Sequence, residues 1–148
     1  MGQSPHPGAA VLLTRLARRV YRVATDERLG MRMKVFSTLN QVRDAGTISQ
    51  QALAEVLGID ANMLVLLLNE AEDAGFARRV RDPKDRRRHN VELTDAGRAA
   101  LVRAEAGVEE AEEGILATLD DAERAQLRAL LAKALEAEDV APRDEVAA

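Results

Sequence analysis

The stretch RRVRDPKDRRRHNVELTDAGR, residues 78–98, interrupts the helical periodicity of the chain with a short, strongly basic segment. Residues 76–81 and 89–93 are predicted as two strands, and Pro83 between two aspartates favours a turn that joins them. Six arginines and one lysine fall within residues 78–88. Helical periodicity resumes directly after the second strand. This stretch therefore predicts a basic β-hairpin that leads into a helix.

The residues before this hairpin predict two short helices joined by a tight turn. Ser49 is a good N-cap for a helix over 50–57, and Gly58 ends that helix. Asp60 then caps a helix that runs to about Ala74. Two short helices with this spacing are typical of a helix-turn-helix unit.

Further helices are predicted on both sides of this unit. Helical periodicity covers 9–30 and 31–45 on one side and 94–116 on the other, and Asp120 with Glu123 resembles a capping box that starts a last helix. The outer helices carry apolar stripes at positions Leu12, Leu16, Val20, Val23, Leu127, Leu130, Leu131 and Leu135. A small winged core cannot cover these stripes, so we expect a second copy of the chain to do so. An intramolecular bundle is the alternative.

The composition agrees with a single, mainly α domain of 148 residues, 47% hydrophobic and with three aromatic residues. There is no cysteine, which excludes disulfides, thiolate metal sites and iron–sulfur clusters. The longest apolar run, 63–68, is too short to span a bilayer, and no secretory signal is visible. We therefore expect a cytoplasmic protein with no membrane association.

The net charge of −4 conceals a strong local asymmetry. Residues 78–91 carry seven Arg or Lys and two Asp, whereas residues 49–77 carry five acidic residues and no Arg or Lys. A dense local patch of positive charge can attract a polyanion even in an acidic protein. The patch therefore favours contact with nucleic acid, the alternative being a solvated basic loop.

The sequence from 78 to 98 resembles the wing of the MarR family of bacterial transcriptional regulators. The wing-tip pattern of that family is matched by Asp82, Lys84, Asp85 and Arg87, and the Leu-Thr-x-x-Gly pattern that follows is matched from Leu93 to Gly97. The segment SQQALAEVLGID, residues 49–60, also fits. The resemblance covers about residues 9–138.

This resemblance implies a winged helix-turn-helix fold with N- and C-terminal helices that form a dimerisation base. Residues 9–30 and 99–138 would form the base, 31–98 the DNA-binding region, and 1–8 and 139–148 flexible tails. Proteins of this family are usually repressors that bind pseudo-palindromic promoter sites as homodimers and are released by small aromatic or anionic ligands.

We expect double-stranded DNA to contact the second helix of the helix-turn-helix, the start of the first, and the wing. Arg32, Lys34 and Arg43 are further candidates for phosphate contacts. The expected DNA-binding residues are Ser49, Gln50, Asn62, Met63, Val65, Leu66, Arg78, Arg79, Lys84, Asp85, Arg86, Arg87 and Arg88.

The outward face of the second helix departs from the polar pattern usual in the family. Leu64, Leu67, Leu68 and Ala71 share the inward stripe, so Asn62, Val65, Leu66, Asn69 and Asp73 face out. Asn can make two hydrogen bonds to adenine, and apolar side chains can contact thymine methyl groups. One interpretation is that the wing supplies most of the affinity for DNA and that the helix prefers A·T-rich sequences. The other is a protein-contact surface with weak DNA binding.

Arg87 is the candidate for insertion into the minor groove, because a narrow A·T-rich groove attracts cations. Asp85 is expected to brace its guanidinium, although the alternative is an exposed ion pair worth under about 1 kcal/mol. Alternation along a strand would point Arg86 and Arg88 to the opposite face.

The resemblance also implies a ligand cleft between the dimer base and the winged lobe. Tyrosine and phenylalanine would stack on an aromatic effector, and arginine would pair with an anionic one. The candidates by position are Tyr21, Arg22, Met31, Met33 and Phe36. The alternative for the methionines and Phe36 is a plain core role.

The sequence carries little that favours an enzyme. Neither His6 nor His89 lies near a serine or cysteine nucleophile pattern, the glutamates at 109–113 spread round a helix, and no Gly-rich phosphate loop is present. We therefore expect no enzyme, no cofactor and no metal. A dimeric anti-repressor or protein-interaction module of the same fold, without DNA binding, is the remaining alternative.

Overall fold

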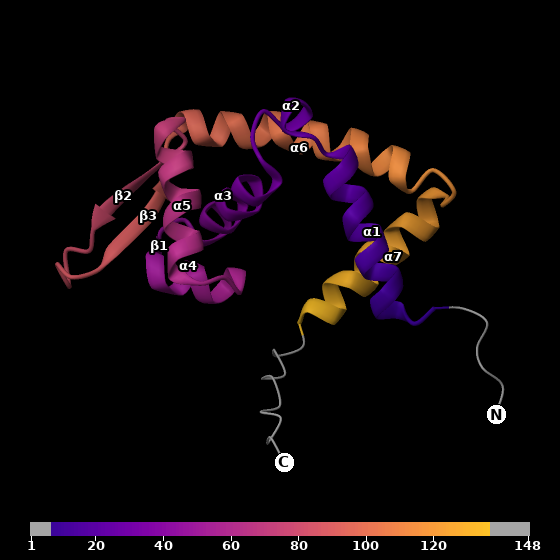
Figure 1. The fold of residues 1–148 in the computed structure, drawn as a ribbon, viewed down its shortest axis with the longest axis horizontal. Coiled ribbons are helices and arrows are strands. Elements are labelled where there is room, and N and C mark those ends of the chain that lie inside the picture. Colours follow the sequence, from indigo (N-terminus) through magenta and orange to yellow (C-terminus); the bar gives the residue numbers. More distant parts are fainter. Residues whose placement is uncertain (1–6, 137–148) are drawn as a thin grey trace, which may run out of the picture. The chain divides into compact units, whose positions relative to one another are not determined.

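A computed structural model describes residues 7–136 and confirms the mainly helical, winged helix-turn-helix fold (Figure 1). The elements, in chain order, are α1 (Ala9–Val23), α2 (Asp26–Leu29), α3 (Met33–Ala45), β1 (Ile48–Ser49), α4 (Gln50–Leu57), α5 (Ala61–Asp73), β2 (Ala77–Arg81), β3 (His89–Leu93), α6 (Asp95–Ile115) and α7 (Asp121–Leu135). The tail expected at 1–8 lies mostly outside the described residues, and the tail at 139–148 lies wholly outside them.

The described chain divides into two compact units, one over residues 7–115 and one over 116–136. The first contains everything from α1 through α6, and the second contains α7. The boundary therefore lies at the end of α6 and not between the winged region and the flanking helices. The assignment of 9–30 and 99–138 to dimerisation remains a prediction.

The helix expected over 9–30 is broken, because α1 ends at Val23 and a separate short helix, α2, follows. Ala24 leaves the helical conformation with ψ of 68°. The break turns Ala24 and Leu29 into the core, where they are 3% and 1% exposed. Burial of these two side chains therefore overrides the local helical preference. The next helix also begins later than expected, at Met33.

The helix-turn-helix formed by α4 and α5 has the boundaries and caps that the sequence predicts. The Ser49 hydroxyl accepts a hydrogen bond from the N–H of Ala52 at 3.1 Å, and the Asp60 carboxylate accepts one from Met63 at 2.8 Å. Gly58 ends α4 with φ of 64°, a left-handed conformation that glycine adopts without strain. Leu53 of α4 and Leu64 and Leu68 of α5 are fully buried, as is Leu39 of α3.

The wing is a three-stranded antiparallel sheet in the order β1-β3-β2. The expected hairpin is present, and β1, just before α4, joins it as a third strand, with Ile48 opposite Val91. Val91 also lies opposite Arg79 of β2 and is completely buried. Figure 1 shows β2 and β3 extending together from the side of α5. The central strand thus anchors the wing in the core.

The start of α6 docks closely on the turn between α5 and β2. The Thr94 hydroxyl donates to the carbonyl oxygen of Gly75 at 2.6 Å and accepts from the N–H of Gly97 at 3.0 Å. The N–H of Thr94 donates to the carbonyl oxygen of Phe76 at 3.1 Å. A Cβ atom at Gly97 would lie 1.9 Å from that same oxygen. The Leu-Thr-x-x-Gly pattern is therefore the sequence of this junction.

In the described residues, no helix on its own combines the length and the apolar character that a membrane span requires, and α4 and α5 pass such a test only as a pair bent by 109°. Leu64, Leu67 and Leu68 of α5 are buried in the core of the first unit. Core packing therefore accounts for the apolar residues on the inward face of α5.

Replacement of Gly97 by Ala should lower the free energy of unfolding by about 2–4 kcal/mol, because the added methyl group overlaps a backbone carbonyl that cannot move independently. Urea denaturation followed by circular dichroism measures this change. Gly114→Ala is the matched control in the same helix, since a Cβ there meets nothing within 4 Å and should raise stability by about 0.5–1 kcal/mol. Equal stabilities for the two variants would contradict the described junction.

Candidate nucleic-acid interface

Helix α5 separates a buried face from an outward one, as its periodicity predicts. Leu64, Leu67, Leu68 and Ala71 are buried, with exposures of 0–3%. The outward stripe consists of Asn62, Leu66, Asn69 and Asp73, which are all exposed, and Val65 flanks it half-buried. Met63, expected among the DNA-binding residues, packs against the core instead.

Arg79 of β2 holds the outer side of α5. Its guanidinium donates to both carboxylate oxygens of Glu72, at 2.6 and 3.1 Å, and to the side-chain oxygen of Asn69 at 2.5 Å. The hydrogen bond from Arg79 lowers the pKa of Glu72 below its usual value, and the same bond raises the pKa of Arg79. Arg79, expected as a phosphate contact, is thus engaged within the protein.

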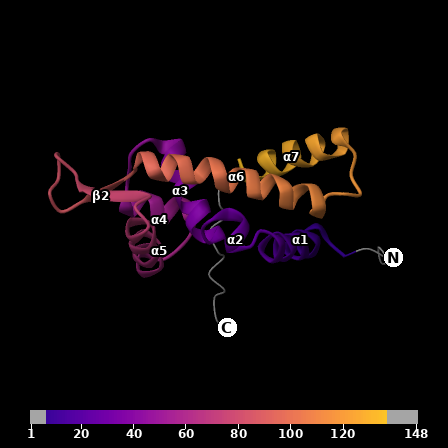
Figure 2. The ribbon, with the colours of Figure 1, turned by 90° about the horizontal axis from the view of Figure 1, so that it is seen from above.

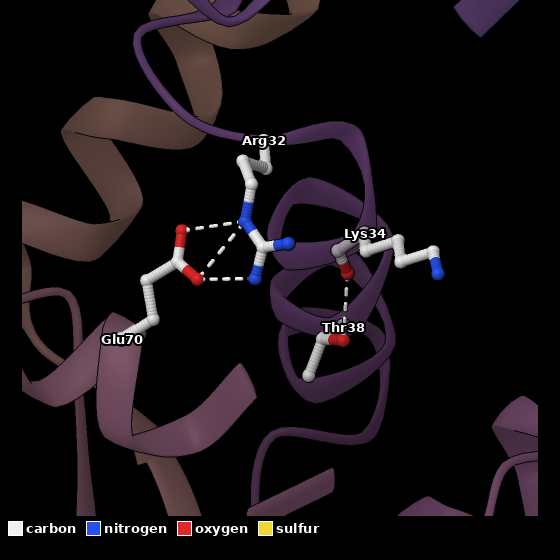
Figure 3. Close-up of polar contacts among 4 residues, drawn as sticks. All are labelled: Arg32, Lys34, Thr38 and Glu70. Atoms are coloured by element: carbon white, nitrogen blue, oxygen red, sulfur yellow. Dashed lines mark hydrogen bonds and ion pairs between the residues drawn. The ribbon is translucent and has the colours of Figure 1, made fainter. Parts of the chain in front are cut away.

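Arg32, the N-cap residue of α3, makes an equivalent contact on the other side of α5. Its Nε donates to the two carboxylate oxygens of Glu70 at 2.9 and 3.0 Å, and its Nη2 also bonds to that carboxylate (Figure 3). The hydrogen bond lowers the pKa of Glu70 and raises that of Arg32. Two carboxylates of α5 are therefore neutralised by arginines from elsewhere in the fold, which reduces the repulsion that a polyanion would meet.

Two successive turns, each begun by an aspartate, form the tip of the wing. The carbonyl oxygens of Asp82 and Asp85 accept the N–H groups of Asp85 and Arg88, at 3.3 and 3.0 Å. The side chains of the same aspartates accept the N–H groups of Lys84 and Arg87, at 2.9 and 3.1 Å. Such side-chain bonds two residues along the chain stabilise tight turns. Lys84 and Arg87 therefore occupy the same position in consecutive turns.

The expected partner of Asp85 is wrong. Its carboxylate lies 3.6 Å from Nε of Arg88 and supports Arg87 through the backbone N–H, not through the guanidinium. The expected alternation of Arg86, Arg87 and Arg88 is also wrong, because Arg86 and Arg87 lie in the turn, before β3 begins at His89. Tight turn formation replaces strand geometry at this point.

The wing tip presents cations that are free to meet a ligand. Lys84, Arg86 and Arg87 are exposed, and within residues 7–136 none of the three forms an ion pair. Arg78 lies 3.4 Å from Glu92 but keeps 64% of its side chain exposed. This tip is the strongest unneutralised positive feature beside the helix-turn-helix.

The start of α4 and the wing line one cleft, which has a volume of about 410 Å³. Ser49 and Gln50 contribute from α4, and Arg87, Arg88 and His89 contribute from the wing. The Ser49 hydroxyl is engaged as the α4 cap, so its polar function is structural. The fold thus gathers the predicted residues of α4 and of the wing on one side of the unit.

Some contributions were not apparent from the sequence. Glu70 and Glu72 orient and neutralise α5, and Asn69 is held by Arg79, although its side chain lies on the outward stripe. These partners lie on separate elements, so no local spacing indicates them. Arg43, a candidate phosphate contact, pairs with Glu105 of α6 at 2.5 Å.

A second cleft of about 410 Å³ is lined by residues of α1, α3, α5 and the turn before α5. Tyr21, predicted as a ligand residue, lines it, together with Lys34, which was predicted as a phosphate contact, and Ser37, which was not predicted. Figure 3 shows Lys34 extending away from the Arg32–Glu70 pair. Lys34, and not Arg22, is the cation of this cleft.

The remaining predicted ligand residues follow the core alternative. Met31 is 8% exposed in the core, and Met33 and Phe36 pack against it. These three side chains contribute to folding of the first unit.

Comparison with known proteins assigns a family to this chain. Residues 32–89 match the model of the MarR family. The chain is 33% identical over 102 residues to a transcriptional regulatory protein assigned to the hcr operon of Thauera aromatica, and 33% identical over 99 residues to the HTH-type transcriptional regulator PecS of Dickeya dadantii. These matches cover 69% and 67% of this chain but only 61% and 60% of the two relatives.

Solved structures agree over a larger part of the chain. A cysteine-to-serine mutant of MarR from E. coli is 25% identical, with a TM-score of 0.77 over 89% of this chain and 99% of that chain. The same mutant in complex with operator DNA is 26% identical, with a TM-score of 0.72 over 85% and 92% of the two chains. Sequence motif, family model and fold thus agree: residues 32–89 match the MarR family, and the chain shares the fold of solved MarR structures.

Replacement of Glu72 by Gln should lower the free energy of unfolding by about 1 kcal/mol at neutral pH, because Arg79 loses a charged acceptor whose side chain is 31% exposed. The lowered pKa of Glu72 means that its contribution is present above the unfolded-state pKa and is lost as the pH falls through the folded-state pKa, below 4.5. Urea titrations of wild type and variant from about pH 7 to about pH 3 should therefore converge in acid.

The matched control is Glu109→Gln, an exposed carboxylate on α6. Its unfolding free energy should track that of wild type throughout the series. A Glu72→Gln penalty that persists unchanged to the lowest pH would show that the loss comes from packing and not from the ion pair.

Proposed function

We propose that this chain is a DNA-binding transcriptional regulator, and not an enzyme, which acts in the cytoplasm as a homodimeric repressor. The observation that carries the proposal is the exposed wing tip, in which Lys84, Arg86 and Arg87 form no ion pair with any residue of the described range 7–136, beside a helix-turn-helix whose Glu70 and Glu72 are neutralised. Such a surface attracts phosphates to the wing and reduces the acidic repulsion that α5 would meet in a groove. The operator-bound form of the E. coli MarR mutant supports this reading for the shared fold.

The proposed interface unites residues from three elements. Asn62, Val65 and Leu66 would face the major groove, Ser49 and Gln50 would lie near the backbone at the start of α4, and the wing would follow the adjacent minor groove. In the wing, Arg87 is the proposed inserted residue.

Binding should weaken steeply as salt is raised, because the wing acts through phosphate neutralisation. Fluorescence anisotropy with a labelled duplex from the region upstream of the chain's own gene measures this. Arg87→Ala should cost on the order of 1–3 kcal/mol of binding free energy. Arg103→Ala, an exposed arginine on α6, is the control and should bind as wild type does.

The outcomes separate the alternatives. If Arg86→Ala and Arg88→Ala weaken binding while Arg87→Ala does not, another arginine is the inserted residue. If all three are silent, or if affinity is flat with salt, the wing does not contact DNA. If no duplex is bound, the chain is the non-DNA-binding anti-repressor or interaction module.

The homodimer rests on exposed apolar surface at both ends of the chain. Leu12 and Leu13 on α1 are 49% and 48% exposed, and Leu130 and Leu135 on α7 are 57% and 86% exposed. Neither helix buries a single residue completely. Apolar faces of this kind are typical of helices that are covered by a second subunit, and a two-fold dimer would explain a pseudo-palindromic site.

Light scattering at micromolar concentration should give a mass near twice 16.1 kDa. Leu130→Glu should shift the mass toward one chain, because it places a charge in the proposed contact. Val102→Glu on α6, where the wild-type side chain is 65% exposed, is the control and should leave the mass unchanged. A monomeric mass for the wild type would contradict the dimer.

The effector proposal rests on the cleft that contains Tyr21 and Lys34. A tyrosine ring and an ammonium group that line one cleft of about 410 Å³ suit a small aromatic anion. The cleft also includes Gly58 and Asp60 of the turn before α5. A ligand in the cleft would therefore contact the residues that orient α5, the recognition helix of the helix-turn-helix.

A further inference from the structure

Leu66 is an apolar side chain on the outward, solvent-facing side of α5. It is 61% exposed in the middle of α5, while its inward neighbours Leu67 and Leu68 are 3% and 0% exposed. Val65 lies beside it, half-buried. Leu66 therefore places an apolar group on the outward face of α5, where the groups around it decide what can approach.

The groups around Leu66 are neutral amides. Asn62 lies one turn before it and Asn69 almost one turn after it, on the same outward stripe. The side-chain oxygen of Asn69 accepts a hydrogen bond from Arg79, which leaves its NH₂ group to donate outward. The centre of the stripe is therefore an apolar surface between two hydrogen-bonding amides.

The charges around this stripe select the occupant. The carboxylate of Glu70 is held by Arg32, that of Glu72 by Arg79, and that of Asp60 accepts the N–H of Met63 as the helix cap. The exposed cations Lys84, Arg86 and Arg87 stand at the wing tip of the same unit. Asp73, the acidic residue at the end of the stripe, lies about two turns beyond Leu66. The centre of the stripe, near two paired carboxylates and the exposed cations of the wing tip, complements the major groove of duplex DNA better than it complements an apolar protein surface.

Thymine is the base that offers an apolar group there. Its 5-methyl group projects into the major groove, whereas the other three bases present only hydrogen-bonding atoms at that edge. Leu66 and Val65 can neither donate nor accept a hydrogen bond, so a methyl contact is the favourable one open to them. Asn62 alongside can make two hydrogen bonds to adenine.

We infer that Leu66, supported by Val65, is the specificity-determining residue of this chain and reads thymine methyl groups at fixed steps of each half-site. The inference rests on the proposed function, since it requires α5 to enter the major groove. Removal of one methyl group from such a contact should weaken binding about fourfold, the equivalent of one buried methyl or methylene group.

Deoxyuridine provides the test, because it lacks the methyl group of thymidine and keeps every hydrogen-bonding atom. A duplex is first selected by repeated binding of the full chain to a random-sequence pool. Each thymidine is then replaced singly by deoxyuridine, and the dissociation constant is measured by anisotropy. We expect a loss of about fourfold at one or two positions in each half-site and no change elsewhere.

Leu66→Ala connects the effect to the residue. The variant should bind the thymidine and deoxyuridine duplexes equally, with the folding stability of the wild type, because the side chain is exposed. Val102→Ala on α6, 65% exposed, is the matched control and should retain the fourfold difference. A positional difference that disappears only in Leu66→Ala supports the inference.

Each other result overturns it. If no deoxyuridine weakens a duplex that the chain binds, Leu66 reads no methyl group while the proposed function stands. If Leu66→Ala keeps the positional difference, another residue reads the methyl. If Leu66→Ala instead lowers the mass of the protein in light scattering, the face contacts a second copy. If the pool yields no bound duplex, both the inference and the proposed function fail.

Discussion

The carbonyl oxygen of Phe76 is the point on which the first unit depends. It accepts the N–H of Thr94, and the Cα of Gly97 approaches so closely that a side chain has no room. Through the Thr94 hydroxyl the same junction holds Gly75, where α5 has just ended. Four residues thereby connect the recognition helix, both long strands and α6, so the angle of the wing to α5 is set by backbone contacts and not by surface side chains.

Side-chain contacts also help to hold α5 in place. Arg32 at the start of α3 and Arg79 on β2 each bind a carboxylate of α5, from two separate elements. Because both pairs are partly exposed, their worth to stability is modest. Their larger effect is on the electrostatic surface, since they leave α5 with an uncharged centre and the wing tip with the free cations. In the proposed interface, the wing tip would attract phosphates and α5 would contact the bases.

Figure 2 shows α2 alongside α6 in the same unit, a contact that depends on Gly107, whose Cα faces the carbonyl of Arg28. Neither this contact nor the break after Val23 is visible in the local pattern, because tertiary burial of Ala24 and Leu29 determines them. The sequence predicted a continuous helix there for that reason.

Elements with strong local signals were predictable. The caps at Ser49, Asp60 and Asp120 appear as expected, the last with a complete capping box, and both strands of the hairpin have nearly their predicted limits. The inward face of α5 was also correct, since its period alone determines it.

The side-chain partners of the candidate site were not predictable. Asp85 contacts Arg88 and the backbone N–H of Arg87 because the wing tip closes into turns. Lys34 lines the cleft because α3 and the turn before α5 lie on the same cleft. The first contact depends on turn geometry at the wing tip, and the second depends on how separate elements approach one another. The spacing of residues along one element does not record them.

The apolar centre of α5 has a consequence for errors in recognition. A guanidinium that meets the wrong base is left dehydrated and unpaired, which carries a large penalty, whereas leucine that meets the wrong base forfeits only a small contact. A protein that recognises bases through apolar contacts would therefore bind related DNA sequences with affinities that differ only slightly. Its DNA sites would become occupied one after another as the concentration of the protein in the cell rises. The amount of protein, as much as the sequence of the site, would then decide which genes respond.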